Sequence, residues 1–268
     1  MTNTQTTQTA ALTSPELAEL IDVAQHWAND VPAHLNLQLD SGNPVLVAKC
    51  WHDICKIGFD RCLAPEAAGG SGLPLHALLA VLQQIATGDG GIAMLTLLAN
   101  VANAVTAHSG HQGLAPFSRP VYVPASSTGG RDLPVFHSGE VNGEATFALA
   151  GQDADGFVIE GISDNEPALI AVERAATGVL VTTIDDQLGL RAATAVELVL
   201  DGAPATVVGH ADDLHLATIT VNLGVAAIAS GIAQKARLMA YEYAANRMQG
   251  GTAIIHYGAV REMLGAMT

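Results

Sequence analysis

Basic residues are scarce in this sequence. Its 268 residues include 11 Lys and Arg against 26 Asp and Glu, for a formal net charge of −15. Nucleic-acid binding needs clustered Lys and Arg to neutralise phosphates, and an anionic membrane surface attracts the same side chains. The charge balance therefore argues against both kinds of partner, although it says nothing about the fold.

Cysteines are few, and all three lie in one short segment, at Cys50, Cys55 and Cys62. The N-terminus from Met1 to Thr13 has neither the charged leader nor the apolar core of a signal peptide, and we expect it to be a disordered tail. An odd number of clustered cysteines without a signal peptide indicates a reducing compartment, so we predict a cytoplasmic protein.

A metal site can be drawn through Cys50, His52, Cys55 and Cys62, but their spacing fits no common zinc pattern. On a helix, Cys50 and Cys55 diverge by about 140° at 3.6 residues per turn. We therefore predict buried structural thiols and no metal.

Long unbroken apolar runs are also lacking. The longest, from Ile92 to Ala107, is interrupted by Thr96, Asn100 and Asn103, which indicates a buried core helix rather than a membrane span. Aromatic residues make up only 4% of the chain, while hydrophobic residues make up 49%. The core is therefore expected to consist of Ala, Val, Leu and Ile.

Helical and strand patterns occupy different parts of the chain. Thr13 and Glu16 have capping-box spacing with Pro15 in the first turn, and an apolar stripe follows from Leu17 to Trp27. Further helices are predicted over 45–57, 74–87, 91–108, 212–247 and 254–267. Strand-like runs punctuated by Gly, Asn and Asp are predicted over 121–123, 145–149, 156–159, 168–172, 178–182, 196–200 and 205–208.

Helices followed by strands and then helices indicate an α+β architecture rather than alternating βαβ units. We predict an N-terminal helical domain over 14–115, a middle antiparallel β-sandwich or barrel over 116–210, and a partial C-terminal helical bundle over 211–268.

Local motifs fall in a consistent order along this architecture. They are Trp51 with Gly58, Pro65-Glu66, Gly69-Gly70-Ser71-Gly72-Leu73, Gly88-Asp89-Gly90-Gly91, Leu188-Gly189-Leu190-Arg191, and Tyr243-Ala244-Ala245-Asn246-Arg247-Met248-Gln249-Gly250-Gly251. With this order of layers, nearly the whole chain resembles the acyl-CoA dehydrogenase family.

The resemblance implies a reaction and a cofactor. In that family a carboxylate base removes the α-proton of an acyl-CoA thioester while a β-hydride passes to FAD. The last motif is similar to the family's Tyr-Ala-x-x-Arg-x-Gln-Phe-Gly, whose arginine reaches across a subunit interface to the pyrophosphate of a neighbour's FAD. This implies a cofactor-binding role for Arg247, Gln249 and Gly251, with Arg247 able to contact phosphate in a bidentate manner. A plain surface or helix-terminal cation is the alternative for Arg247.

The sequence departs from the family at the flavin ring and at the base. The Thr-Glu-Pro to Gly-Ser-Asp stretch that holds the ring in the family is replaced by residues 124–130, Pro-Ala-Ser-Ser-Thr-Gly-Gly. The Trp-Ile-Thr/Ser-Asn stretch that covers the ring has only a faint counterpart at 162–165. The family's usual catalytic glutamate lies on a segment later in the fold than the last predicted helix of this chain. Some members of the family place the base near the start of the long helix instead, and there this sequence has Leu214, His215 and Leu216, none of which is a carboxylate. We therefore predict no catalytic residue in this chain.

These departures indicate that two different subunits share the active site. We expect a hetero-oligomer in which a related acyl-CoA dehydrogenase subunit carries the base and the flavin ring site. This chain would complete the FAD site, the substrate would be a bulky or cyclic acyl-CoA, and an electron-transfer flavoprotein is a candidate acceptor. Two half-bundle helices would expose an apolar face, which also favours association. The alternatives are a non-catalytic structural or regulatory subunit, and an independent homo-oligomeric enzyme with a relocated base such as Glu242 or Asp213.

Overall fold

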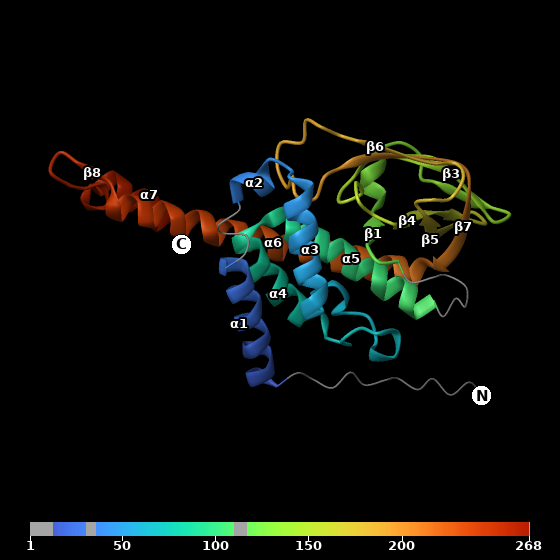
Figure 1. Ribbon diagram of the computed structural model, residues 1–268, viewed down its shortest axis with the longest axis horizontal. Coiled ribbons are helices and arrows are strands. Elements are labelled where there is room, and N and C mark those ends of the chain that lie inside the picture. The colour runs from blue at the N-terminus through green and yellow to red at the C-terminus, as the bar shows by residue number, and fades with distance from the viewer. Residues whose placement is uncertain (1–12, 31–35, 110–116, 268) are drawn as a thin grey trace.

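The computed structural model describes residues 13–30, 36–109 and 117–267. Helices come first, a barrel of strands follows, and one long helix and one short helix close the chain (Figure 1). The α+β architecture predicted from the sequence is confirmed. Except for Thr13, the predicted N-terminal tail lies outside the described residues, as does the predicted boundary between residues 115 and 116.

Five helices form the N-terminal part: α1 Ser14–Asp30, α2 Asn36–Asp40, α3 Pro44–Ile57, α4 Leu75–Gly88 and α5 Gly90–Ser109. The predicted cap of α1 is present, because the Thr13 N–H and hydroxyl donate to the Glu16 carboxylate at 2.8 and 2.7 Å. α3 begins after Asn43, whose side chain accepts from the first turn, and ends at Gly58 in the left-handed conformation.

The core helix of this part is α5. From Gly91 to Ala102 every residue is buried. The Thr96 hydroxyl and the Asn100 side-chain amide donate hydrogen bonds to backbone carbonyl groups of α5 itself. By length and composition, α5 and the later helix α6 are each apolar enough to cross a membrane. Since 67% of its apolar stretch is buried inside the molecule, α5 is a core helix, as predicted.

Seven strands form the middle part: β1 Pro120–Val123, β2 Val135–His137, β3 Glu140–Ala148, β4 Gly156–Ser163, β5 Glu166–Glu173, β6 Val179–Thr183 and β7 Val196–Gly209. The pairings β4–β2–β3–β7–β5 return to β4 and close a barrel, while β1 adds beside β4 and β6 beside β7.

The barrel differs from the prediction in two respects. β1 and β2 both run parallel to β4, because neither is joined to it by a tight hairpin, so the barrel is not purely antiparallel. The runs predicted over 196–200 and 205–208 are one strand, β7, since Val141 of β3 pairs with Ala203 across the expected break.

The long helix α6, Ala211–Asn246, crosses α4 and α5. Its close approach requires glycine at two positions. A β-carbon at Gly224 would stand 2.4 Å from Leu97 Cδ1, and one at Gly231 would stand 2.2 Å from the Gln83 carbonyl oxygen. Beyond Gly231 only Ala244 of this helix is buried, so the end of α6 leaves the body of the molecule (Figure 1).

A short hairpin and a last helix complete the chain: β8 Met248–Gln249, β9 Thr252–Ala253 and α7 Gly258–Ala266. α7 packs back against α6. The predicted start of the last helix at residue 254 is wrong, because Ile254–His256 form a 3-10 turn and α7 begins at Gly258.

Candidate functional site

An apolar cavity of about 220 Å³ opens where α4, α5 and α6 meet. One lining residue comes from the loop after α3, one from the start of α4, and the others from α5 and α6. The lining consists of Leu63, Leu75, Val101, Ala104, Val105, His108, Asp213, Leu216, Ala217 and Thr220.

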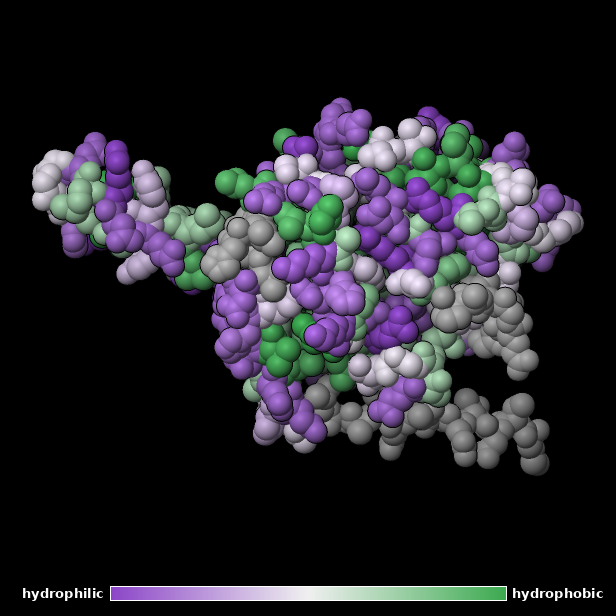
Figure 2. Space-filling view, in the orientation of Figure 1, coloured by the Kyte–Doolittle hydropathy of each residue, from purple (hydrophilic) through white to green (hydrophobic). Residues whose placement is uncertain are grey.

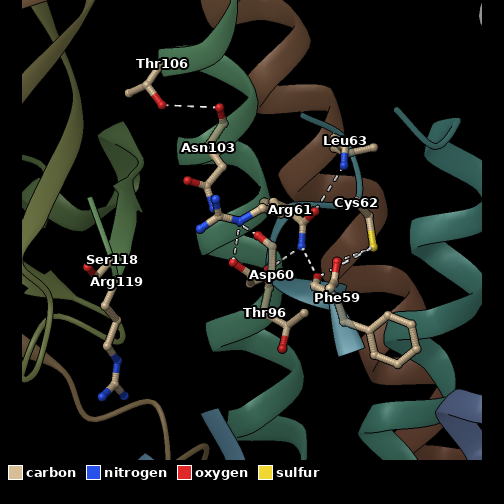
Figure 3. Close-up of polar contacts among 12 residues, drawn as sticks. Phe59, Asp60, Arg61, Cys62, Leu63, Thr96, Asn103, Thr106, Ser118 and Arg119 are labelled. Carbon is tan, nitrogen blue, oxygen red and sulfur yellow. Dashed lines mark hydrogen bonds and ion pairs between the residues drawn. The ribbon is translucent and has the colours of Figure 1, made fainter. Parts of the chain in front are cut away.

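Two asparagines of α5 form hydrogen bonds with the loop that contains Leu63 (Figure 3). The Asn100 side chain donates to the Phe59 carbonyl at 2.7 Å and accepts the Leu63 N–H at 3.3 Å. Asn103 donates to the Asp60 carbonyl at 3.0 Å. Asn100 and Asn103, which interrupt the apolar sequence of α5, therefore hold one wall of the cavity in place.

The polar groups at the cavity have partners within the chain. The Thr220 hydroxyl donates to the Leu216 carbonyl at 2.8 Å. His108 Nδ1 lies 2.7 Å from the Ala104 carbonyl oxygen, and the Asp213 carboxylate accepts the His210 N–H at 3.0 Å. The interior thus offers hydrocarbon contacts, which suit an apolar group.

Asp213 is the only carboxylate among the lining residues. It was one of two positions considered for a relocated base, and its side chain is exposed at the cavity. The other, Glu242, lies near the exposed end of α6 and does not line the cavity.

The stretch expected from the sequence to correspond to the family's flavin-holding loop, residues 124–130, makes hydrogen bonds within itself and to β4. Residues Ala125–Thr128 form a 3-10 turn in which the Ser127 N–H donates to the Pro124 carbonyl at 2.9 Å. The Ala125 N–H donates to the Glu160 carboxylate of β4 at 2.9 Å, and Pro124 has no N–H to offer.

Glu160 is the centre of a buried polar cluster. The Tyr122 hydroxyl of β1 donates to it, and the Thr218 hydroxyl of α6 lies 3.4 Å from the carboxylate. Burial and the neighbouring carboxylate raise the pKa of Tyr122. Sequence reasoning missed this pair, although a single carboxylate inside the apolar strand Phe157–Ile162 was a usable signal.

The counterpart of the ring-covering stretch is a tight turn. Ser163 pairs with Glu166, and Asp164 and Asn165 between them have φ of +52° and +64°, as in a two-residue hairpin loop. Together with the closed Pro124–Gly130 stretch, this geometry does not fit a flavin ring held by the chain's own loops.

The predicted cofactor-binding residues lie together on the β8–β9 hairpin, apart from the cavity. Gly250 and Gly251 have φ of +59° and +84° and form the turn. Arg247 and Gln249 are exposed, and the Gln249 carbonyl accepts the Tyr257 hydroxyl at 2.7 Å. No hydrogen bond or ion pair of the Arg247 guanidinium is found within the described residues.

The cysteines are structural. Cys50 and Cys62 are buried and Cys55 is half-buried, and burial raises the pKa of each thiol, to about 11 for Cys50 and about 12 for the other two. In the described part of the chain, no group of three His, Cys, Asp or Glu side chains is placed to hold a metal.

Comparison with known proteins agrees with this geometry. Residues 14–113 match the family model for the acyl-CoA dehydrogenase N-terminal domain. This stretch therefore resembles the N-terminal domain of acyl-CoA dehydrogenases, and the chain as a whole shares the fold of solved members of that family. A search of curated proteins found no match.

Solved acyl-CoA dehydrogenases share the fold over almost the entire chain. Glutaryl-CoA dehydrogenase from Mycobacterium smegmatis superposes with a TM-score of 0.79 and 18% identity, covering 96% of this chain and 72% of that one. Butyryl-CoA dehydrogenase from Megasphaera elsdenii gives 0.78 and 17%, covering 96% and 75%. An acyl-CoA dehydrogenase from Bacillus anthracis complexed with FAD gives 0.75 and 16%, covering 95% and 48%.

Proposed function

We propose that this chain is a subunit of a flavin-dependent acyl-CoA dehydrogenase that oxidises the α,β-bond of an acyl-CoA thioester. It completes the FAD site of a related partner subunit, and that partner supplies the catalytic base. The observation that carries the proposal is the contrast between the closed Pro124–Gly130 stretch and the unpaired Arg247 guanidinium.

FAD is the proposed cofactor. When bound, it accepts the β-hydride, since no side chain can do so. The Ala125 N–H donates to Glu160, and the Ser127 and Gly129 N–H groups donate within the turn, so we assign the ring to the partner. Arg247 and Gln249 are free to donate to the FAD pyrophosphate from the exposed hairpin.

The apolar cavity supports a role for this chain in holding the acyl group. An apolar cavity of about 150 Å³ holds benzene, so the space of about 220 Å³ beside Leu63 and Val105 accommodates a compact ring or branched group. A bulky or cyclic acyl-CoA is therefore the proposed substrate, an electron-transfer flavoprotein the proposed acceptor, and the cytoplasm the proposed location.

The decisive experiment measures FAD in the complex isolated from its own host. Arg247→Ala removes a charge-assisted contact worth about 1.5–3 kcal/mol, so the FAD dissociation constant should rise at least about tenfold. Arg191→Ala, which removes an exposed arginine on the barrel side, is the matched control. Unchanged FAD affinity in the Arg247 variant would refute the shared site.

The alternative is a non-catalytic subunit that braces a complete dehydrogenase. The internal hydrogen bonding of the flavin-holding stretch favours it, because a bracing subunit needs no open flavin site. The same pair of variants separates the two functions. A bracing subunit predicts that FAD content and turnover are the same in the Arg247→Ala and Arg191→Ala complexes.

A further inference from the structure

The two helices that supply most of the lining of the apolar cavity, α5 and α6, run antiparallel. Gly90 of α5 lies beside Ile232 of α6, since a β-carbon on this glycine would stand 2.7 Å from the isoleucine Cδ1. Seven residues later on α5, Leu97 lies beside Gly224, which comes eight residues earlier on α6. A step toward the end of α5 is therefore a step toward the start of α6, and the cavity has two distinct ends.

Four lining residues mark these ends. Four residues further along α5 and four residues back along α6, Val101 is level with Thr220. Another seven residues in the same directions bring His108, near the end of α5, level with Asp213, in the first turn of α6. All four residues line the cavity, and seven residues of helix separate the two pairs by about 10 Å.

The end at Val101 and Thr220 is the closed one. Both residues are buried, as is Ala217 beside them, and the Thr220 hydroxyl donates to a backbone carbonyl of its own helix. The side chains of His108 and Asp213 are exposed. These two residues therefore lie at the mouth of the cavity.

The mouth has two free hydrogen-bond acceptors. A carbonyl oxygen only accepts, so His108 Nδ1, which lies 2.7 Å from the Ala104 carbonyl oxygen, carries the proton. Nε2 of the neutral ring is then an acceptor, and no partner of it is found in the part of the chain that the structure describes. One Asp213 carboxylate oxygen accepts the His210 N–H, and the other has no partner among the described residues.

Free side-chain donors are lacking in the lining. Among its ten residues, His108 and Thr220 are the two with a side-chain N–H or O–H, and both groups donate to backbone carbonyls. A bound molecule that brings its own donor satisfies the acceptors at the mouth. A carbonyl or carboxylate oxygen would instead face two acceptors, one of them charged.

Charge and hydration narrow the choice of donor to a hydroxyl group. Hydrophilic residues cover much of the surface seen in Figure 2, and the chain has 26 acidic residues against 11 basic ones. This excess of negative charge disfavours a carboxylate. An ammonium group would lose more hydration than a hydroxyl beside the hydrocarbon of Val105 and Leu216.

We propose that the cavity binds a compact ring or branched hydrocarbon that carries a hydroxyl group, and that this hydroxyl donates to Asp213 at the mouth. The hydrocarbon part lies against Val101 and Ala217, and His108 Nε2 is the second acceptor. That this molecule is the acyl group of the substrate rests on the proposed function, whereas the binding itself needs only this chain.

The test compares three probes built on the same ring: cyclohexanol, cyclohexanone and cyclohexylamine. Their dissociation constants for the purified full chain are measured by ligand-observed NMR. Cyclohexanol should bind at least about fivefold more tightly than the ketone, a ratio that corresponds to a net hydrogen bond of about 1 kcal/mol. Equal binding of alcohol and ketone, tighter binding of the amine, or no binding of any probe would overturn the proposal.

Three variants locate the hydroxyl. Asp213→Asn keeps an oxygen for the His210 N–H but adds an N–H donor, so the preference for the alcohol should fall to within about twofold. Asp212→Asn makes the same charge change at an exposed neighbour that does not line the cavity, and it should keep the preference. Ala104→Phe fills the cavity with a ring and should abolish binding of cyclohexanol. Full preference in Asp213→Asn, or undiminished binding in Ala104→Phe, would refute the assignment.

Failure of the proposed function gives a different result. Unchanged FAD affinity in the Arg247→Ala complex, with alcohol preference in the isolated chain, would remove the shared FAD site and leave the hydroxyl-binding cavity standing. Weakened FAD binding in that complex, without alcohol preference in the isolated chain, would refute the cavity assignment alone.

Discussion

The Glu160 carboxylate of β4 accepts the backbone N–H of Ala125 at 2.9 Å. This contact joins the middle of a barrel strand to residues 124–130, the stretch that the resemblance aligns with the family's flavin-holding loop. The Tyr122 hydroxyl donates to the same carboxylate, and Thr218 brings α6 beside it. The barrel and α6 thus meet at the buried Glu160 cluster, where the hydrogen-bond donors find their acceptor within the chain.

Glu160→Ala should strongly destabilise the fold. Glu160 is 7% exposed, and its removal leaves the Tyr122 hydroxyl and the Ala125 N–H buried without an acceptor. The expected loss in the free energy of unfolding is about 2–4 kcal/mol, measured by urea denaturation. Glu166→Ala, at the exposed end of the β4–β5 hairpin, should change it by less than about 0.5 kcal/mol. A similar small change in both variants would show that the cluster is not a structural clamp.

Gly231→Ala should separate α6 from α4. The new methyl group would stand 2.2 Å from the backbone carbonyl oxygen of Gln83, which cannot move without shifting α4. Overpacking of this kind costs about 1–3 kcal/mol of unfolding free energy. Gly258→Ala in α7 meets no atom within 4 Å and should be neutral or slightly stabilising, since alanine favours helix. Equal stability of the two variants would contradict the packing described for α6.

Asn100→Ala should loosen the wall of the cavity. It removes the acceptor of the Leu63 N–H and the donor to the Phe59 carbonyl, at a cost of about 1–3 kcal/mol for the buried groups left without partners. Limited proteolysis should then cut within residues 58–73 earlier than in the wild type. Asn246→Ala, which removes a single exposed bond to the Glu242 carbonyl, should leave that cleavage rate unchanged.

The three thiols should resist modification at neutral pH and make stability fall at alkaline pH. Their pKa values are raised by burial to about 11 or 12, so the folded chain keeps them protonated while the unfolded chain ionises near its ordinary pKa of about 8.5. Their contribution to stability is therefore full below about pH 8.5 and is lost as the pH rises toward 12. A thiol reagent at pH 7.5 should label the buried Cys50 and Cys62 only in denaturant, and rapid labelling of either in the native chain would contradict their burial.

Most of the fold could be predicted from local patterns. The Thr13–Glu16 cap, the Asn100 and Asn103 breaks in a core helix and the glycine at the end of α3 each follow from short-range physics. The sequence predicts two strands over 196–200 and 205–208, because Asp201 and Gly202 between them have the composition of a turn. Pairing with β3 instead continues β7 through these residues as one strand. The parallel pairings of β4 depend on contacts distant in sequence, which no local pattern encodes.

The site was harder to predict because it is assembled from distant segments. The cavity combines residues from Leu63 to Thr220, and the sequence suggests a catalytic role for only one of them, Asp213. The Tyr122–Glu160 pair lies 38 positions apart in sequence. The hairpin of Arg247, Gln249 and Gly251 is local and was identified by motif, and its role in binding FAD stays a prediction.

The visible absorbance of the purified chain shows whether it holds a flavin ring by itself. After incubation of the wild-type chain with excess FAD and removal of free cofactor, we expect no retained flavin. The complex with its partner subunit, treated in the same way, should retain flavin. Retention of one FAD per chain in the absence of any other subunit would show that the flavin site is complete within this chain.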